Sequence, residues 1–114
     1  MKTHGSGRLL RIFVDEEDRW HGQPLYTAIV EALRRERIAG ATVFQGIEGF
    51  GSHATLHQAK VFSLMPNLPI LIEVVDTDER IAAILPLVES MVPEGLITLE
   101  RVDFTRYSRD QQPS

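Results

Sequence analysis

The chain has 114 residues, which is long enough for a single domain with its own hydrophobic core. Its net charge of −4 gives no electrostatic reason to expect binding to nucleic acid or to an anionic membrane. The absence of cysteine excludes a disulfide framework, thiol catalysis and thiolate metal sites, and the N-terminus lacks the apolar run of a signal peptide or a membrane helix. We therefore expect a cytoplasmic protein of one domain, without insertion into a membrane.

The first part of the chain predicts a tail, a strand and a helix. Residues 1–7 are small and polar, so they predict a flexible N-terminal tail. The apolar, β-branched run Arg8–Val14 predicts the first strand. Pro24 is a favourable first helical residue, and Gly40 is placed to end the helix that follows. The apolar residues of this helix recur at helical spacing: Tyr26, Ile29, Val30, Leu33 and Ile38.

Two further strands flank a long connection. Ala41–Ile47 predicts the second strand and Leu68–Val75 predicts the third, which is apolar on both faces except for Glu73. Residues 48–67 show little periodicity of apolar residues and predict a long loop. Within it, Ala54–Met65 could form either a short helix or an edge strand. We expect this loop to be mobile when no partner is bound.

A second helix and a fourth strand complete the pattern. Asp76 followed by Glu79 resembles a capping box in which Asp76 is the N-cap. The apolar residues that follow trace an amphipathic helix: Ile81, Ile84, Leu85, Val88, Met91 and Val92. Pro86 lies inside this helix and is expected to kink it. Leu96–Phe104 predicts the last strand, whose change of apolar parity suggests a bulge or an exit from the sheet. Residues 105–114 predict a flexible C-terminal tail.

The order of elements is β-α-β-β-α-β, which is typical of the ferredoxin-like arrangement. We therefore predict an α+β domain over residues 8–104, with a four-stranded antiparallel sheet and both helices on one face. If the opposite face of the sheet met water, the side chains on it should be polar. Instead, its residues on the first and third strands are largely apolar: Leu9, Phe13, Leu71 and Val75.

Two arrangements would cover this second apolar face. Self-association is the more economical one, and the alternative is a monomer whose long loop covers the sheet. In a subunit interface we expect Phe13, Leu71 and Glu73 to be buried. Glu73 would then face Arg11 or Arg101, unless it lies at an exposed strand end.

The second strand ends in the glycine-rich stretch VFQGIEGFGSH at residues 43–53, which raises the question of a phosphate site. The spacing of Gly46, Gly49 and Gly51 is not the dinucleotide fingerprint, and no Gly-Lys-Ser/Thr follows, so the known nucleotide motifs are excluded. One interpretation is structural: Gly46 permits a bulge or close packing, and the two later glycines take positive φ. The other is a ligand site lined by backbone amides, with Glu48 beside it.

Other chemistry has little support in the sequence. His53 and His57 are four residues apart with Glu48 nearby, so a metal site can be drawn, although solvated polar residues are the simpler interpretation. Ser52 beside His53 has no identifiable orienting acid, which argues against a hydrolase, and we expect no catalytic residues. The third strand carries no aromatic residue on which bases could stack, so we expect no nucleic-acid partner.

Three stretches of the chain carry a resemblance to a known family. They are GQPLYTAIVEALRRERIAGATVFQGIEGFGSH, LPILIEVVDTDERI and EGLITLERV, and the resemblance spans about residues 8–104. On these stretches the chain resembles the domain of unknown function 190 family. That family is similar to the P-II nitrogen-regulatory signalling proteins, which are ferredoxin-like and usually homotrimeric. In P-II proteins a long loop between strands two and three contacts target proteins, and adenine nucleotides bind between subunits.

The resemblance implies a non-enzymatic, trimeric regulator that senses a small ligand. That ligand would be an adenine nucleotide with a divalent cation, and the 48–67 loop would contact a target protein, for which a membrane transporter is one candidate. The chain departs from P-II proteins at VVDTDERI, where their phosphate loop has glycine and lysine, and it has no tyrosine in the long loop. Two alternatives on the same fold are a CutA-like metal-binding protein and a small enzyme.

The ligand site implied by the resemblance lies between subunits. Its candidate residues are Gly46, Glu48, Gly49, Gly51, Asp76 and Arg80. We expect the amides around Gly46–Gly51 to face the start of the second helix, where the helix N-terminus favours an anion. Asp76, Asp78 and Glu79 oppose an anion there, so binding should require magnesium or another divalent cation.

Overall fold

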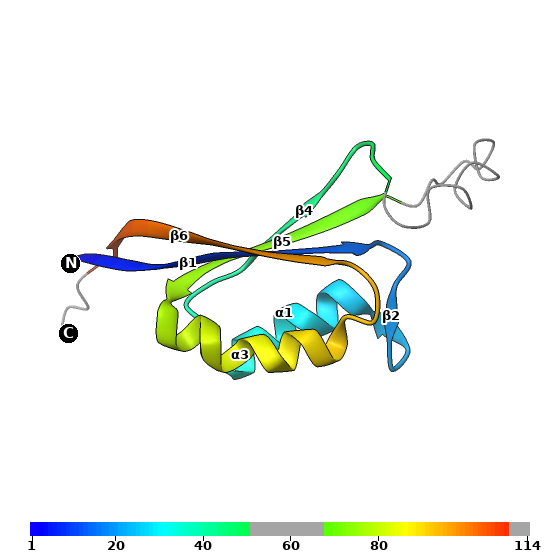
Figure 1. Ribbon diagram of the computed structural model, residues 1–114, viewed down its shortest axis with the longest axis horizontal. Coiled ribbons are helices and arrows are strands. Elements are labelled where there is room, and N and C mark those ends of the chain that lie inside the picture. Colours follow the sequence, from blue (N-terminus) through cyan, green and yellow to red (C-terminus); the bar gives the residue numbers. More distant parts are fainter. Residues whose placement is uncertain (51–67, 110–114) are drawn as a thin grey trace.

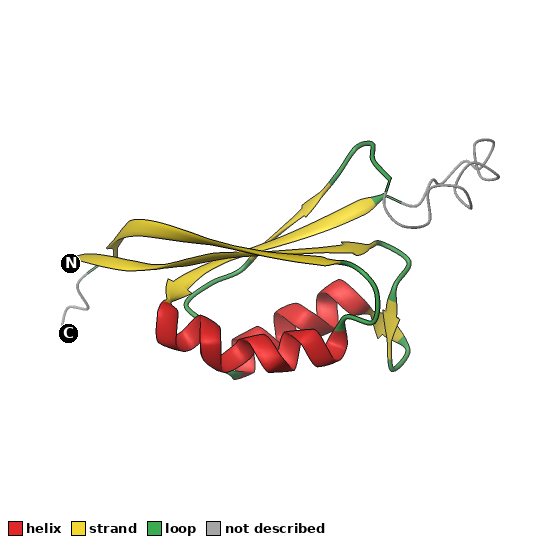
Figure 2. Ribbon diagram, in the orientation of Figure 1, coloured by secondary structure: helices red, strands yellow, loops and turns green. Residues whose placement is uncertain are grey.

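The protein forms one four-stranded sheet with two helices against one of its faces (Figures 1 and 2). The computed structural model describes residues 1–50 and 68–109. Its elements are β1 (Lys2–Asp15), β2 (Arg19–Trp20), β3 (Gln23–Pro24), α1 (Leu25–Arg35), β4 (Thr42–Gln45), β5 (Pro69–Thr77), α3 (Asp78–Met91) and β6 (Leu96–Tyr107). The main sheet has the strand order β4-β5-β1-β6, with every neighbouring pair antiparallel. The predicted ferredoxin-like α+β fold is therefore confirmed.

The hydrophobic core lies between the sheet and the helices. Strand β5 and residues 9–15 of β1 alternate strictly between buried and half-buried residues, as expected when only one face of a sheet is fully covered. The core consists of Leu10, Ile12, Val14, Leu25, Ala28, Ile29, Ala32, Leu33, Ile70, Ile72, Val74, Ile81, Ile84, Val88 and Met91. Among the described residues, no element covers the opposite face, which is the upper one in Figure 1. We call it the open face.

Strand β1 is longer than the sequence predicts. Residues 2–7 pair with residues 102–107 of β6, so the predicted flexible tails at 1–7 and 105–107 are wrong. The pairing of β1 with β6 runs without interruption from Lys2–Tyr107 to Phe13–Leu96, so of the two alternatives predicted for the last strand the bulge is wrong. The other alternative, an exit from the main sheet, is what residues 103–107 show. Residues 2–6 and 103–107 extend beyond β5 as a two-stranded ribbon, which we call the arm.

The small residues at the base of the arm have a packing role. A Cβ atom on Gly5 would lie 2.6 Å from the Phe104 ring, and one on Gly7 would lie 2.1 Å from the carbonyl oxygen of Asp76. Glycine is therefore required at Gly7, where the backbone leaves no room for a side chain, whereas a side chain at Gly5 would have to displace the Phe104 ring. The polar, glycine-containing composition that suggested a tail is the composition that this strand pairing needs.

Two turn features were not recognised in the sequence. Strands β2 and β3 form a small hairpin whose turn residues, His21 and Gly22, both have positive φ, as a two-residue turn requires. At the end of α1, Arg37 has a φ of 62° and closes the helix in place of the predicted Gly40. The amide of Ile38 donates to the carbonyl of Leu33, which is the hydrogen bond of a Schellman cap.

Arg37→Gly is expected to raise the free energy of unfolding by about 0.5–1 kcal/mol, because glycine adopts the left-handed conformation without strain. The contact from Arg80 to this residue is to the Arg37 carbonyl, so the substitution keeps it. Urea unfolding measures the change. Arg35→Gly, inside the last turn of α1, serves as the matched control and is expected to lower stability by about the same amount. A loss of stability in Arg37→Gly would contradict this account of the cap.

Candidate functional site

A cluster of charged residues surrounds the N-terminus of α3. Arg8 on β1 donates to Asp78 over 3.2 Å, and Arg101 on β6 approaches the other oxygen of Asp78 at 3.9 Å. Arg80, in the first turn of α3, donates to the carbonyl oxygen of Arg37 over 2.8 Å. The three guanidinium groups thus come from three different elements and converge on one helix terminus. We call Arg8, Arg80 and Arg101 the arginine cluster.

Thr77, and not Asp76, is the N-cap of α3. Its side chain accepts a hydrogen bond from the amide of Arg80 over 3.3 Å, so the predicted capping box is wrong. Asp76 is only 2% exposed, and its two oxygens accept from the amides of Ala39 (3.0 Å) and Thr77 (2.8 Å). Asp76 therefore joins the connection between α1 and β4 to the start of α3.

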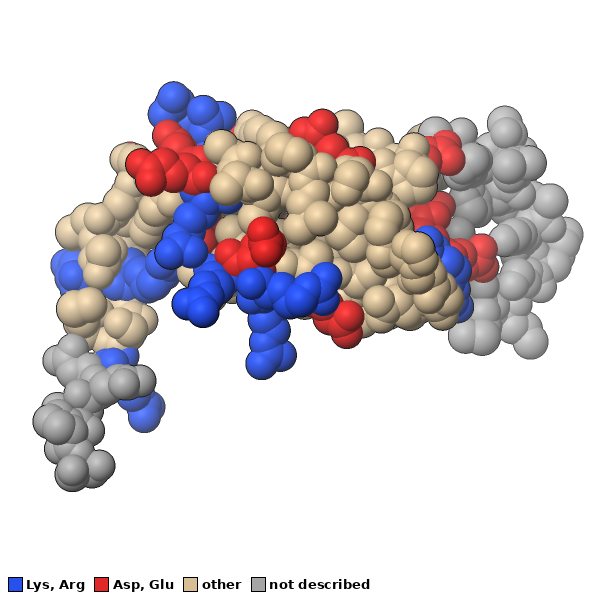
Figure 3. Space-filling model, turned by 90° about the horizontal axis from the view of Figure 1, so that it is seen from below, with Lys and Arg blue, Asp and Glu red and all other residues tan. Residues whose placement is uncertain are grey.

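The charge distribution favours an anion at this end of the molecule. Seen from the helix-covered side, most of the lysine and arginine side chains gather in the half that carries the arm (Figure 3). The arginine cluster belongs to this half, and the N-terminus of α3 adds the positive end of a helix dipole. Asp78 offsets part of this charge through its contacts with Arg8 and Arg101.

The glycine-rich stretch lies at the other end of the sheet. The amide of Gly46 donates to the carbonyl oxygen of Pro69 over 2.8 Å, so this amide is already bonded within the chain. A Cβ atom on Gly46 would lie 2.6 Å from the Pro69 ring, and one on Gly49 would lie 3.1 Å from it. The prediction of close packing at Gly46 is confirmed, whereas the positive φ predicted for Gly49 is wrong. Gly51, His53 and His57 lie outside the described residues.

Glu16 holds the two strands that lead into the long loop. One carboxylate oxygen accepts from the side chain of Gln45 on β4 (2.8 Å), and the other accepts from the amide of Leu68 (3.3 Å). The amide of Glu16 also donates to the carbonyl of Leu68. No sequence signal distinguishes Glu16, because it lies in the acidic run Asp15–Asp18, which looks like a solvated loop.

The predicted ligand residues do not form one site within a single chain. Gly46 and Gly49 adjoin Pro69 at the start of β5, whereas Asp76 is seven positions along the same strand and Arg80 follows in α3. At about 3.4 Å per residue the two groups are about 24 Å apart. Of these two groups, the one at the start of α3 combines several cationic side chains among the described residues, so it is the better candidate for a phosphate.

The open face carries the predicted interface residues. Phe13 pairs with Leu71, and Arg11 pairs with Glu73, with all four side chains half-buried. Arg11 donates to Glu73 over 2.9 Å and to Glu100 over 2.8 Å. The hydrogen bond to Glu73 is the main cause that raises the pKa of Arg11. Of the two partners predicted for Glu73, Arg11 is correct.

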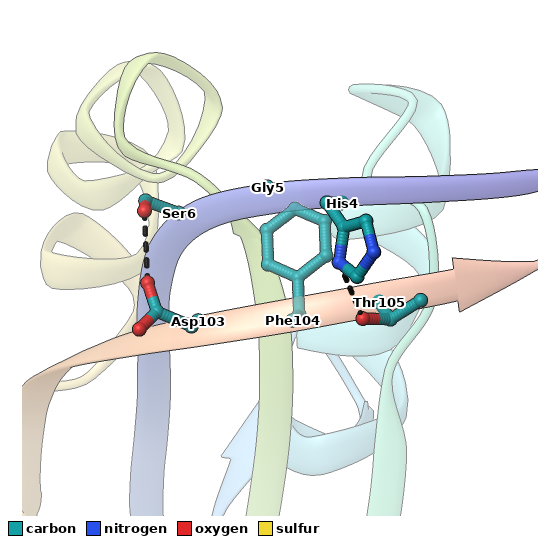
Figure 4. Close-up of a pocket in the computed structure, with 6 residues that line it drawn as sticks. All are labelled: His4, Gly5, Ser6, Asp103, Phe104 and Thr105. Carbon is teal, nitrogen blue, oxygen red and sulfur yellow. Dashed lines mark hydrogen bonds between the residues drawn. The ribbon is translucent and has the colours of Figure 1, made fainter.

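The arm contains a cavity that the sequence did not predict (Figure 4). Its volume is about 350 Å³, and its lining residues are His4, Gly5, Ser6, Asp103, Phe104 and Thr105. The polar groups pair across the two strands: Ser6 donates to Asp103 over 2.9 Å, and His4 Nδ1 lies 2.9 Å from the Thr105 hydroxyl. Since the carboxylate of Asp103 bonds to Ser6, it does not orient His4 as a general base.

Residues 1–50 and 68–109 offer neither a metal site nor a membrane span. That part of the chain contains no group of three or more histidine, aspartate and glutamate side chains able to hold a metal ion. Neither of its helices is long and apolar enough to span a membrane.

Sequence comparisons relate most of the chain to one family. The sequence model of DUF190, described as "Uncharacterized ACR, COG1993", matches residues 7–104. A UPF0166 protein of Aquifex aeolicus is 36% identical over 96 residues, which cover 84% of this chain and 90% of the relative. A UPF0166 protein of Methanocaldococcus jannaschii is 40% identical over 93 residues, which cover 81% and 85%.

Structural comparisons relate the fold to PII-like proteins. CPII of Thiomonas intermedia, a nitrogen regulatory PII-like protein, superposes in its apo form with a TM-score of 0.60 at 13% identity, covering 94% of this chain and all of CPII. CPII bound to ADP, AMP and acetate gives 0.56 at 15% identity, with 91% and 93% covered. A putative PII-like signaling protein of Thermus thermophilus gives 0.56 at 18% identity, with 90% and 91% covered. At these identities the likeness establishes the fold.

Proposed function

Because the chain belongs to the DUF190 family, we propose that it is a P-II-like regulatory protein, a homotrimer that binds an adenine nucleotide between its subunits. The observation that carries the proposal is the open face of a PII-like fold. Its half-buried apolar residues, Phe13 and Leu71, lie beside the ion pair of Arg11 with Glu73. A second copy of the chain would supply the missing cover.

The nucleotide is proposed from chemistry that this chain shares with its structural neighbours. CPII, which has the same fold, is known in a complex with ADP and AMP. In this chain the arginine cluster and the N-terminus of α3 supply the positive charge that phosphate groups require. Asp78 and Glu79 add negative charge nearby, so we expect a divalent cation to strengthen binding. The phosphates are therefore assigned to the α3 end, and not to the amides of the glycine-rich stretch.

Calorimetric titration of the purified protein with ATP, ADP and AMP, with magnesium and with a chelator, tests the proposal. We expect binding that is stronger with magnesium. Arg101→Ala should weaken it tenfold or more, since a charge-assisted hydrogen bond contributes about 1.5–3 kcal/mol. Arg19→Ala changes the net charge equally on the distant hairpin and should bind like the unchanged protein. No binding of any nucleotide at about 1 mM would refute the ligand class, because affinities weaker than that are not specific.

Contact with a target protein through residues 48–67 stays a prediction. Residues 51–67 lie outside the described part of the chain, and Glu48 and Phe50 at its start are exposed. The support for this contact is the placement of the segment between β4 and β5, where P-II proteins carry their target-binding loop. Co-purification with the full chain, compared with a chain shortened across this segment, measures whether a target depends on it.

A further inference from the structure

Three polar cross-strand pairs lie in a row on β1 and β6, on the same side of the sheet as the helices. The pairs are Arg8 with Arg101, Ser6 with Asp103, and His4 with Thr105. Side chains of alternate strand residues share a face, and the next residue of this series on β1, Leu10, belongs to the core. The row therefore leads without a change of face from the arginine cluster at the start of α3 into the arm.

The cavity of the arm lies between the second and the third of these pairs (Figure 4). Gly5 and Phe104 line it between the two pairs. The Phe104 ring points to the other side of the arm, where it covers Gly5 and where the guanidinium of Arg106 lies 5.3 Å from the ring centroid. These contacts support the arm from behind, so the cavity is formed before any ligand binds.

The walls of the cavity carry groups that suit a sugar and a base. Ser6 donates to Asp103 over 2.9 Å, which leaves the exposed carboxylate able to accept further hydrogen bonds. A carboxylate that accepts from sugar hydroxyls is the means by which dinucleotide-binding proteins recognise ribose. On the other wall, the Thr105 hydroxyl lies 2.9 Å from His4 Nδ1 and holds the imidazole, a ring on which a base can stack.

The spacing of the three pairs fits a nucleotide laid along the arm. Neighbouring pairs are two residues apart, which is about 7 Å along a strand, so the first and the third pair are about 14 Å apart. Phosphates bound at Arg8 and Arg101 place the sugar beside Asp103 and the base beside His4. The charges agree with this order, because the cationic pair lies at the phosphate end and the carboxylate lies where the uncharged sugar would be.

We infer that the cavity of the arm holds the ribose and the base of the nucleotide, and that Asp103 selects ribonucleotides over deoxyribonucleotides. The inference rests on the nucleotide of the proposed function and adds its sugar specificity. The Asp103 carboxylate accepts a hydrogen bond from a ribose hydroxyl when the ligand is bound. A deoxy sugar displaces water from the carboxylate without returning a donor, and a site built to bond a hydroxyl discriminates strongly against a ligand that lacks it.

Calorimetric titration of the full chain with ATP, 2′-deoxy-ATP and 3′-deoxy-ATP, all with magnesium, tests this inference. ATP should bind about tenfold or more tightly than at least one of the two analogues, since a hydrogen bond to a charged group contributes a factor of that order. Asp103→Ala should erase this preference by weakening the binding of ATP, without a comparable effect on that analogue. Glu89→Ala makes the same change of charge near the far end of α3 and should keep the preference.

The possible outcomes separate the sugar specificity from the proposed function. Equal affinities of the unchanged protein for ATP and both analogues would overturn the inference and keep the nucleotide. A preference for ATP that persists in Asp103→Ala would place the ribose elsewhere and would also overturn it. Arg101→Ala should weaken all three ligands alike, because they share their phosphates. Failure of all three ligands to bind would refute the proposed function, and the inference with it.

Discussion

If the protein is the proposed trimer, Phe13→Asp is expected to turn it into monomers, so that the mass measured by light scattering falls from three times 12.9 kDa to 12.9 kDa. Phe13 lies on the open face beside Leu71 and Leu96. In a monomer this position meets water, so an aspartate there leaves the core intact. In the trimer it would bury one carboxylate per subunit without a partner, and each such ion costs several kcal/mol. The cost recurs in each of the three subunits, so the assembly is expected to dissociate.

The matched control is Leu87→Asp, which introduces the same charge on the exposed side of α3. This variant should remain a trimer, and far-ultraviolet circular dichroism should show that both variants keep their helices and strands. If Phe13→Asp were folded and still trimeric, the open face would not be the subunit interface, and the proposed assembly would be wrong.

Asp76→Ala is expected to lower the free energy of unfolding by about 2–4 kcal/mol. The substitution leaves two amides, those of Ala39 and Thr77, without an acceptor in a site where the carboxylate is 2% exposed. A buried donor left unsatisfied costs about 1–3 kcal/mol, and here there are two. Urea unfolding at one fixed protein concentration measures the change, because the stability of an oligomer depends on its concentration.

Asp103→Ala is the control for this prediction. Asp103 is exposed and accepts one hydrogen bond from Ser6, so its removal should change stability by about 0.5 kcal/mol or less. Equal effects of the two substitutions would show that burial of Asp76 does not matter to the fold.

The sequence predicted those parts of the fold that depend on local periodicity. The apolar run Arg8–Val14 and the helical spacing after Pro24 and Asp76 reflect burial against one core, so the elements and their order follow from them. The extension of β1 to Lys2 could not be predicted in the same way. Its residues are polar and small, and they form a strand because β6 lies beside them and Phe104 covers Gly5.

The candidate site was predicted in part. Arg80 was recognised, but Arg8 and Arg101 join it only through the pairing of β1, β6 and the start of α3, which a linear sequence does not display. Asp76 was noticed for its spacing from Glu79, yet its role depends on Ala39, which the fold brings to it from another connection. Gly46 was noticed as part of a glycine-rich stretch, whereas its neighbour Pro69 explains why glycine is needed there.

The central position of β1 sets the order in which the sheet can form. Arg11 meets Glu73, 62 residues further along the chain, and Glu100, 89 residues further along. The two strands that flank β1 in the sheet, β5 and β6, are therefore synthesised after it, and β6 is the last strand to be synthesised. During synthesis α1 can coil as soon as it emerges, but β1 keeps one side open until β6 arrives. Contacts of such long sequence separation slow folding, since the chain must be ordered over many residues before they form.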